Sequence, residues 1–316
     1  MEVQVTVGRQ TRRSPIGELS EATGVPVRTI RFYCDTGLLA FERTGGGHRT
    51  FDAAVAVDRL LLIRRLRALG LGLAAITEVL GGERSIGEVV EAERAALDIE
   101  VEALAWRRAA LLAVRDSDPD DRAARLELLA GVADRTVAQD TLVLFWHGAL
   151  SALPPELLDA FVTMNVPMLP GEPSPGQLVG FAELVAAVTD PAVRLLLKQQ
   201  LWRRDPFRVR DRRGLLIGVA EACLEVGSRL AEGVPPRPGA ELDRFVDAHA
   251  RARGERDTPE LRRQLHIGGS GARVDRYWSV TGELLGDPIT SATALCWLDE
   301  ALALSLPGAV DRIVPA

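Results

Sequence analysis

The chain has 316 residues, of which 47% are hydrophobic and 26% are charged, enough for two domains that each have a hydrophobic core. The three cysteines form no C-x-x-C pair, which excludes a small disulfide-stapled domain and favours a reducing cytoplasm. No apolar run approaches the roughly 20 residues of a membrane-spanning helix, and the N-terminal segment has no signal-peptide charge order. We therefore expect a soluble cytoplasmic protein without a membrane partner.

The net charge of −6 is unevenly distributed along the chain. The first 72 residues hold eleven arginines and seven acidic residues, so they carry +4 and the remainder carries −10. A basic module at the front of an acidic protein indicates that this module alone meets a polyanion.

Two short helices are predicted near the N-terminus. The first covers 14–24 and ends at Gly24, and the second covers 27–35 and follows Pro26, which prevents continuation of the first. Two short helices joined by a tight turn form a helix-turn-helix. The next segment, LLAFERTGGGHRTF, has apolar residues on both sides of three glycines, which predicts a two-stranded β-hairpin, the wing.

Three further helices are predicted, from Asp52 to Gly70, over 73–80 and over 85–115. In the helix over 85–115, the residues of one side recur at alternating intervals of four and three positions, as in a two-stranded coiled coil. This seam consists of Leu97, Val101, Leu104, Arg108 and Leu111. The spacing alone leaves two interpretations open, a dimerisation arm and a long intramolecular helix.

Beyond residue 116 the pattern is helical throughout, without strand alternation. Amphipathic stretches fall at 122–150, 154–166, 177–187, 191–203, 213–232, 240–253, 258–266, 273–285 and 290–305. The predicted fold is therefore mainly α. Its predicted parts are a flexible tail (1–13), a winged helix-turn-helix (14–82), a coiled-coil helix (85–116) and an all-α domain (120–316).

Residues 16–80 resemble the MerR family of bacterial transcription regulators. The resemblance is carried by IGELSEATGVPVRTIRFYCDTGLL, then ERTGGGHRTFD, then RLLLIRRLRALGLGLAAITEVL, in the order and spacing of that family. The helix over 85–115 lies where the family has its dimerising coiled coil, which favours the dimerisation arm. The sequence departs from the family pattern at Phe32, Cys34 and His48.

The second helix of a helix-turn-helix presents its N-terminal half to the major groove. We therefore expect Arg28 and Thr29 to read base edges, and Arg31 and Tyr33 to hold phosphates. Wing residues are expected on the flanking DNA backbone. The predicted wing contacts are Arg43, His48 and Arg49.

The resemblance implies a homodimer on a pseudo-palindromic promoter operator, associated with the nucleoid when bound. Effector binding to the C-terminal domain would change the shape of the promoter DNA and so act indirectly on RNA polymerase. The DNA deformation costs about 1–6 kcal/mol. An effector can shift that balance only through different affinities for the two dimer states.

The sequence argues against a metal, a cofactor and an enzyme. The helix over 85–115 has no cysteine where metal-sensing members place one, and no cluster of cysteines could hold an iron–sulfur centre. An acidic run from Asp116 to Glu127 partly matches a calcium loop, but Pro119 interrupts it. An enzyme fused to a DNA-binding head has no supporting catalytic constellation.

The C-terminal domain is rich in aromatic residues, which suit a pocket for a small hydrophobic organic effector. The candidate effector-binding residues are Trp146, Phe161, Met164, Trp202, Tyr277 and Trp278. The alternative is a protein-interaction module. An enclosed aromatic-lined cavity would favour the effector, and a flat exposed apolar patch would favour the protein partner.

Overall fold

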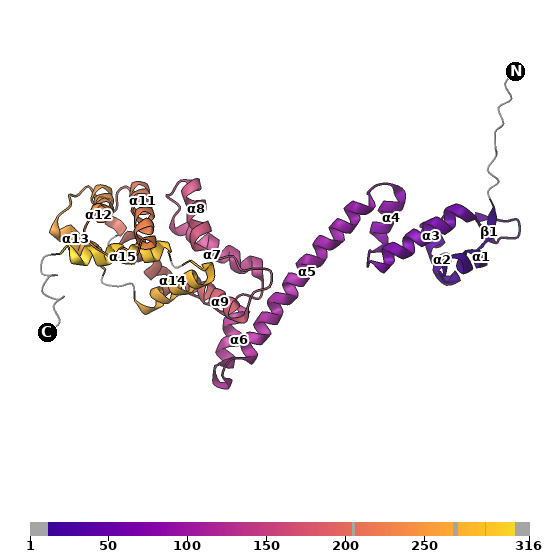
Figure 1. The fold of residues 1–316 in the computed structure, drawn as a ribbon, viewed down its shortest axis with the longest axis horizontal. Coiled ribbons are helices and arrows are strands. Elements are labelled where there is room, and N and C mark those ends of the chain that lie inside the picture. Colours follow the sequence, from indigo (N-terminus) through magenta and orange to yellow (C-terminus); the bar gives the residue numbers. More distant parts are fainter. Residues whose placement is uncertain (1–11, 204–205, 268–270, 288, 307–316) are drawn as a thin grey trace, which may run out of the picture. The chain divides into compact units, whose positions relative to one another are not determined.

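The structure, a computed structural model, describes residues 12–203, 206–267, 271–287 and 289–306. The chain forms two compact units, one up to Val101 and one from Glu102 onward (Figure 1). Their border lies within the long helix α5 (Ile86–Arg115), not at the loops where the sequence predicted domain boundaries. The two ends of α5 belong to different cores, because Val89 packs in the N-terminal core and Trp106 in a C-terminal one.

The N-terminal unit begins with short elements before α5. They are β1 (Arg13–Pro15), α1 (Ile16–Thr23), α2 (Val27–Asp35), β2 (Glu42–Arg43), β3 (Arg49–Asp52), α3 (Ala53–Ala68) and α4 (Leu73–Gly81). Helix α1 ends where Gly24 adopts φ +68°, a left-handed conformation that glycine takes without a steric cost. Helix α3 begins at Asp52, whose carboxylate accepts a hydrogen bond from the Val55 N–H.

The sheet has three antiparallel strands in the order β1-β3-β2, one more than the predicted hairpin. Arg13, which the sequence placed in a flexible tail, pairs with Asp52 in this sheet. The added strand has only three residues and includes Pro15, so it is too short to show an alternating pattern. The hairpin itself is confirmed, with Arg43 opposite Arg49.

One hydrophobic core holds the N-terminal unit together. Its buried side chains come from every helix of the unit and from β3, and include Leu19, Ile30, Phe51, Leu60, Ile63 and Ile76. The packing fixes α2 and the hairpin on a common scaffold.

The C-terminal unit is built of helices in the part that the structure describes. They are η1 (Pro119–Asp121), α6 (Arg122–Ala130), α7 (Arg135–Ala149), α8 (Pro155–Asn165), α9 (Pro175–Thr189), α10 (Pro191–Trp202), η2 (Pro206–Arg208), α11 (Arg212–Ala231), α12 (Ala240–Arg253), α13 (Pro259–Leu265), α14 (Ala272–Leu285) and α15 (Ser291–Leu304). The predicted helix over 122–150 is wrong in one respect, since it is two helices. It breaks after Gly131, and Asp134 caps the second part by accepting from the Val137 N–H.

Two hydrophobic clusters lie within the C-terminal unit. Helix α9 contacts α6, α7, α10 and α14 in the first cluster, and α11 packs on α12 and α15 in the second. Trp202 packs at the edge of both clusters. Among the described helices, none combines the length and the hydropathy that crossing a membrane requires.

Candidate nucleic-acid interface

Helix α2 presents two arginines to solvent from its N-terminal half. Arg28 and Arg31 are exposed and Thr29 is half-buried, while Ile30 and Cys34 are buried in the core below. The amphipathic spacing produces this split, because residues three and four apart share a helix face. The structure thus leaves three of the four α2 side chains predicted to meet DNA accessible on one short helix.

Tyr33 does not lie where the sequence placed it. Its side chain is only 9% exposed and packs in the core, whereas the neighbouring Phe32 is 46% exposed. The two rings are 5.9 Å apart between centroids. Tyr33 follows Ile30 by three residues and so continues the buried face of α2. We therefore assign Tyr33 to the core instead of to a phosphate contact.

The wing carries two exposed side chains that were predicted to contact DNA. Arg43 and His48 are exposed on the two sides of the glycine turn, where Gly47 has φ +80°. The Arg43 guanidinium donates to the Gly47 carbonyl at 3.3 Å and lies 5.7 Å from the centroid of the Phe41 ring. The turn therefore positions Arg43 beside the wing tip.

Arg49 is held inside the domain by three contacts. Its guanidinium donates to the Asp35 carboxylate and, at 3.2 Å, to the Arg31 carbonyl of α2. It also lies 4.6 Å from the centroid of the Phe41 ring, a cation–π contact. The hydrogen bond that the Arg49 guanidinium donates to the Asp35 carboxylate raises the pKa of Arg49. Arg49 thus ties the wing to the second helix, a role that the sequence did not indicate.

Three other arginines of this unit bond to backbone carbonyls. Arg59 donates to the Leu38 carbonyl at 2.7 Å, Arg64 to the Thr23 carbonyl at 2.6 Å, and Arg67 to a carbonyl after α3. Thr23 is the last residue of α1, so Arg64 satisfies a carbonyl that the helix leaves free. These side chains therefore stabilise the scaffold.

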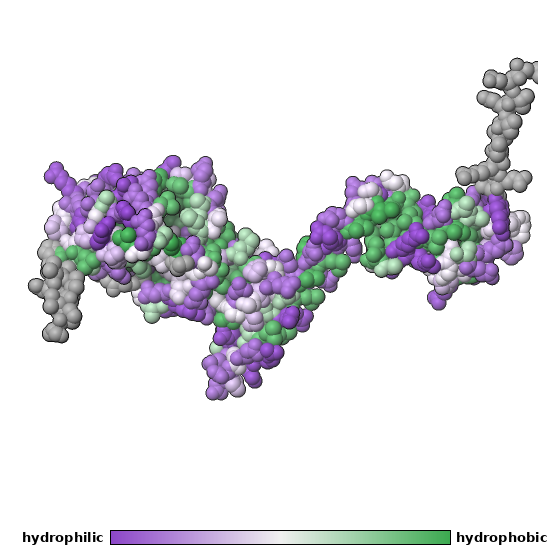
Figure 2. Space-filling view, in the orientation of Figure 1, coloured by the Kyte–Doolittle hydropathy of each residue, from purple (hydrophilic) through white to green (hydrophobic). Residues whose placement is uncertain are grey.

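The predicted seam of α5 lies at the surface of the single chain. Its four apolar side chains are all about half-exposed or more, with Leu104 at 58% and Leu111 at 64%. Figure 2 shows hydrophobic residues at the surface along α5. The opposite side of its C-terminal half is buried, where the indole N–H of Trp106 donates to the Val132 carbonyl at 2.9 Å. Helix α5 therefore has one side in a core and one side without cover within the chain.

Most of the predicted effector-binding residues form a packed aromatic cluster. Trp146 contacts Phe161 at 5.0 Å, Trp278 at 5.4 Å and Tyr277 at 6.2 Å between ring centroids. The indole N–H of Trp146 donates to the Tyr277 hydroxyl at 2.9 Å, and burial raises the pKa of that phenol. Trp146, Tyr277 and Trp278 are buried in the first hydrophobic cluster, and Phe161 packs against it.

The other two predicted effector-binding residues lie outside this cluster. Met164 is 50% exposed near the end of α8, and Trp202 packs elsewhere, at the edge of both cores. Trp278 borders an open groove of about 560 Å³ between α14 and α15. The sequence identified aromatic residues correctly but could not tell a packed cluster from a pocket, because both use the same residue types.

No group of three or more histidine, cysteine or acidic side chains that could hold a metal ion occurs among the described residues. His147 lies on α7 and His249 on α12, and His266 directly follows the end of α13.

Comparison with known proteins gives a match to the MerR HTH family regulatory protein model over residues 15–83. The nodulation protein NolA of Bradyrhizobium elkanii is 45% identical over 91 residues, which are 28% of this chain and 41% of that protein. The regulator HmrR of Rhizobium leguminosarum bv. viciae is 43% identical over 65 residues, 21% of this chain and 50% of HmrR.

The HTH-type transcriptional regulator GlnR of Bacillus anthracis is 34% identical over 95 residues, 29% of this chain and 73% of GlnR. The chain thus spans about two fifths of the length of the NolA proteins that it matches. No solved structure matches it significantly. The matches cover between a fifth and three tenths of this chain, so they bear on the DNA-binding part.

Proposed function

The chain belongs to the MerR family of DNA-binding transcription regulators, and from this premise we propose that it binds a pseudo-palindromic promoter operator as a homodimer. The observation that carries the proposal is the exposure of Arg28 and Arg31 on α2, next to a wing tied to the same helix through Arg49. Arginine at the N-terminal half of a recognition helix pairs with guanine O6 and N7 in the major groove. Arg43 and His48 of the wing then contact the flanking backbone.

Dimerisation follows from the uncovered seam of α5. Covering a leucine side chain is worth about 1.5–3 kcal/mol, so pairing two such seams stabilises a dimer substantially. Arg108 interrupts the apolar run at one step and keeps its charge in water. A two-fold symmetric dimer presents its two recognition helices to two half-sites, which accounts for the pseudo-palindrome.

Regulation would use the C-terminal unit as the sensor of a small organic effector. Trp106 joins the C-terminal half of α5 to the core of this unit, while the seam lies on another side of the same helix. An effector that binds one dimer state more tightly would shift α5 and thereby the shape of the promoter. RNA polymerase would respond through the DNA, and we expect this to occur in the cytoplasm, on the nucleoid.

The test of this function uses the full-length chain and an operator selected from random DNA. We expect the selected sequence to have two-fold symmetry and the protein to weigh two chains in sedimentation equilibrium. The double variant Leu104→Glu with Leu111→Glu should be monomeric and bind the operator at least about a hundredfold more weakly, because charges would oppose each other in the seam.

A matched control places the same two charges on other exposed leucines. Leu126→Glu with Leu144→Glu changes side chains on α6 and α7 that are 57% and 68% exposed. This variant should remain dimeric and keep operator binding. A monomeric wild-type protein, or a selected site without symmetry, would contradict the proposal.

A further inference from the structure

A pocket of about 400 Å³ in the C-terminal unit lies against α13 and is lined mainly by positive charge. Four arginines border it, Arg203, Arg208, Arg253 and Arg263, together with one acid, Glu260. Its size is at the lower end of the range for small-molecule sites. Its charge is opposite to the net charge of the chain, which is −6.

Arg203 is the most unusual of these residues. It is 2% exposed, and its guanidinium donates to the Asp299 carboxylate at 3.0 Å and lies 5.0 Å from the Phe245 ring centroid. Among the described residues, its Nε–H has no hydrogen-bond partner. A buried donor of a charged group that remains without a partner costs stability, so such groups require an explanation.

The backbone of Arg203 is also strained. It has φ +56° and ψ −156°, the one positive φ among the described non-glycine residues. An arginine in this region is strained, and the surrounding structure must hold it there. Backbone strain of this kind is concentrated at ligand sites. The side chain of the strained residue, Arg203, lines the pocket.

Arg253 is held in place from the other side. Its guanidinium donates to the His249 Nδ1 at 2.8 Å and to the Trp202 carbonyl at 2.9 Å. Burial, and then the charges of Arg203 and Arg253, keep the pKa of His249 well below its ordinary value. The imidazole is therefore neutral and accepts a hydrogen bond from Arg253 without adding a cation of its own.

The other two arginines lie at the rim. Arg208 donates to the Glu255 carboxylate at 2.6 Å and also to Gln264, and Arg263 pairs with Glu260 at 2.8 Å. Exposed ion pairs of this kind contribute little stability. Exchanging either ion pair for a contact with a bound anion would therefore cost little free energy.

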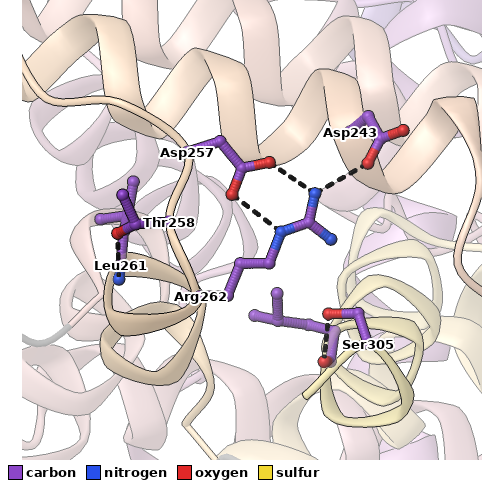
Figure 3. Close-up of polar contacts among 7 residues, drawn as sticks. Asp243, Asp257, Thr258, Leu261, Arg262 and Ser305 are labelled. Atoms are coloured by element: carbon purple, nitrogen blue, oxygen red, sulfur yellow. Dashed lines mark hydrogen bonds and ion pairs between the residues drawn. The ribbon is translucent and has the colours of Figure 1, made fainter. Parts of the chain in front are cut away.

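Helix α13 forms one wall of the pocket and is anchored firmly to α12 (Figure 3). The guanidinium of Arg262 donates to both oxygens of Asp257 and, at 2.8 Å, to Asp243 on α12. Thr258 caps α13 by accepting from the Leu261 N–H at 3.1 Å. Leu261 and Leu265 are buried and line the pocket, so α13 gives it an apolar strip beside its polar side chains.

We propose that this pocket binds a small organic acid, whose carboxylate or phosphate oxygens contact Arg203 and Arg253 and whose carbon skeleton lies on the apolar strip of α13. The proposal deepens the proposed function and rests on it, because it assigns the effector site and the chemical class of the effector. Guanidinium groups are suited to this task, since their planar N–H donors match the oxygens of a carboxylate and of a phosphate.

The test is a calorimetric titration of the full-length protein without DNA. The probes are benzoate, citrate and inorganic phosphate at constant ionic strength, and benzyl alcohol serves as the neutral counterpart of benzoate. We expect saturable binding of an anionic probe and none of benzyl alcohol. The double variant Arg208→Gln with Arg263→Gln should bind that anion about tenfold more weakly, because it removes charged donors at the rim.

The matched control is Arg244→Gln. Arg244 lies on α12, pairs with one acid, Glu225, and does not line the pocket. This variant should bind the anion like the wild type. Absence of binding by all three anions, or binding that the double variant leaves unchanged, would overturn the proposal.

The same preparation is titrated with operator DNA in a separate experiment. Operator binding by a dimer that takes up none of the three anions would overturn the pocket and leave the proposed function standing. Anion binding without operator binding would overturn the proposed function and leave the pocket standing. The two proposals therefore fail in different experiments.

Discussion

Arginine is used in opposite ways in the two units of this protein. In the N-terminal unit, Arg28 and Arg31 stand in water, where a guanidinium keeps its hydration and needs no counter-charge. In the C-terminal unit, Arg203 and Arg253 are buried, where each must be matched by hydrogen bonds. The first arrangement suits a large polyanion that approaches from outside, and the second suits a small anion that enters a pocket.

The largest effect should come from removing the acid that faces Arg203. Asp299→Ala leaves a buried guanidinium without its carboxylate, so we expect the free energy of unfolding to fall by about 3–5 kcal/mol. Urea unfolding followed by tryptophan fluorescence measures the change. Glu225→Ala removes the acid from an exposed pair and should change stability by less than about 1 kcal/mol. Equal effects of the two variants would remove the distinction between buried and exposed arginines.

Arg28→Ala should have the next largest effect, and this effect should be on operator binding instead of on the free energy of unfolding. Loss of a base contact should weaken operator binding by about 1–3 kcal/mol and relax the preference at one base pair of each half-site. Binding to the selected operator and to single-base variants, at fixed salt, measures both effects. An unchanged preference in Arg28→Ala would show that another residue reads the base.

Local signals sufficed for most of the fold. The stop at Gly24, the cap at Asp52 and the uninterrupted apolar spacing of α5 are each encoded within a few residues, and the structure has these elements. The break between α6 and α7 was also encoded locally, by Gly131 and by Asp134, which caps the second helix. The prediction missed it because the amphipathic pattern continues across the break.

The roles of particular side chains were harder to predict, because they depend on partners far away in the sequence. Arg49 pairs with Asp35, which lies 14 positions earlier, and no local pattern connects them. Arg203 of the pocket pairs with Asp299, which lies 96 positions later, and no local pattern connects these two residues either. Tyr33 is the exception, since its spacing from Ile30 already indicated burial.

His249 provides a prediction on pH. Its pKa in the folded chain is lowered by burial, so the unfolded chain takes up a proton first, as the pH falls through the ordinary histidine pKa. Stability is therefore full above about pH 6.5 and declines below it, by up to about 1.4 kcal/mol per pH unit. Urea unfolding between pH 7.5 and 5.5 measures the slope. His249→Gln should flatten it, and an unchanged slope in His249→Gln would place the titrating group elsewhere.

The smallest effect concerns the wing. It tests whether the Arg49 guanidinium contacts DNA, as proposed for the exposed arginines, or is held by contacts within the domain. If Arg49 only ties the wing to α2, Asp35→Ala and Arg49→Ala should weaken operator binding equally, and the double variant should be no worse than either. A phosphate contact would instead lower the salt dependence of binding by about one ion in Arg49→Ala alone. We expect the first result, because the Asp35 carboxylate, the Arg31 carbonyl and the Phe41 ring already engage the Arg49 guanidinium.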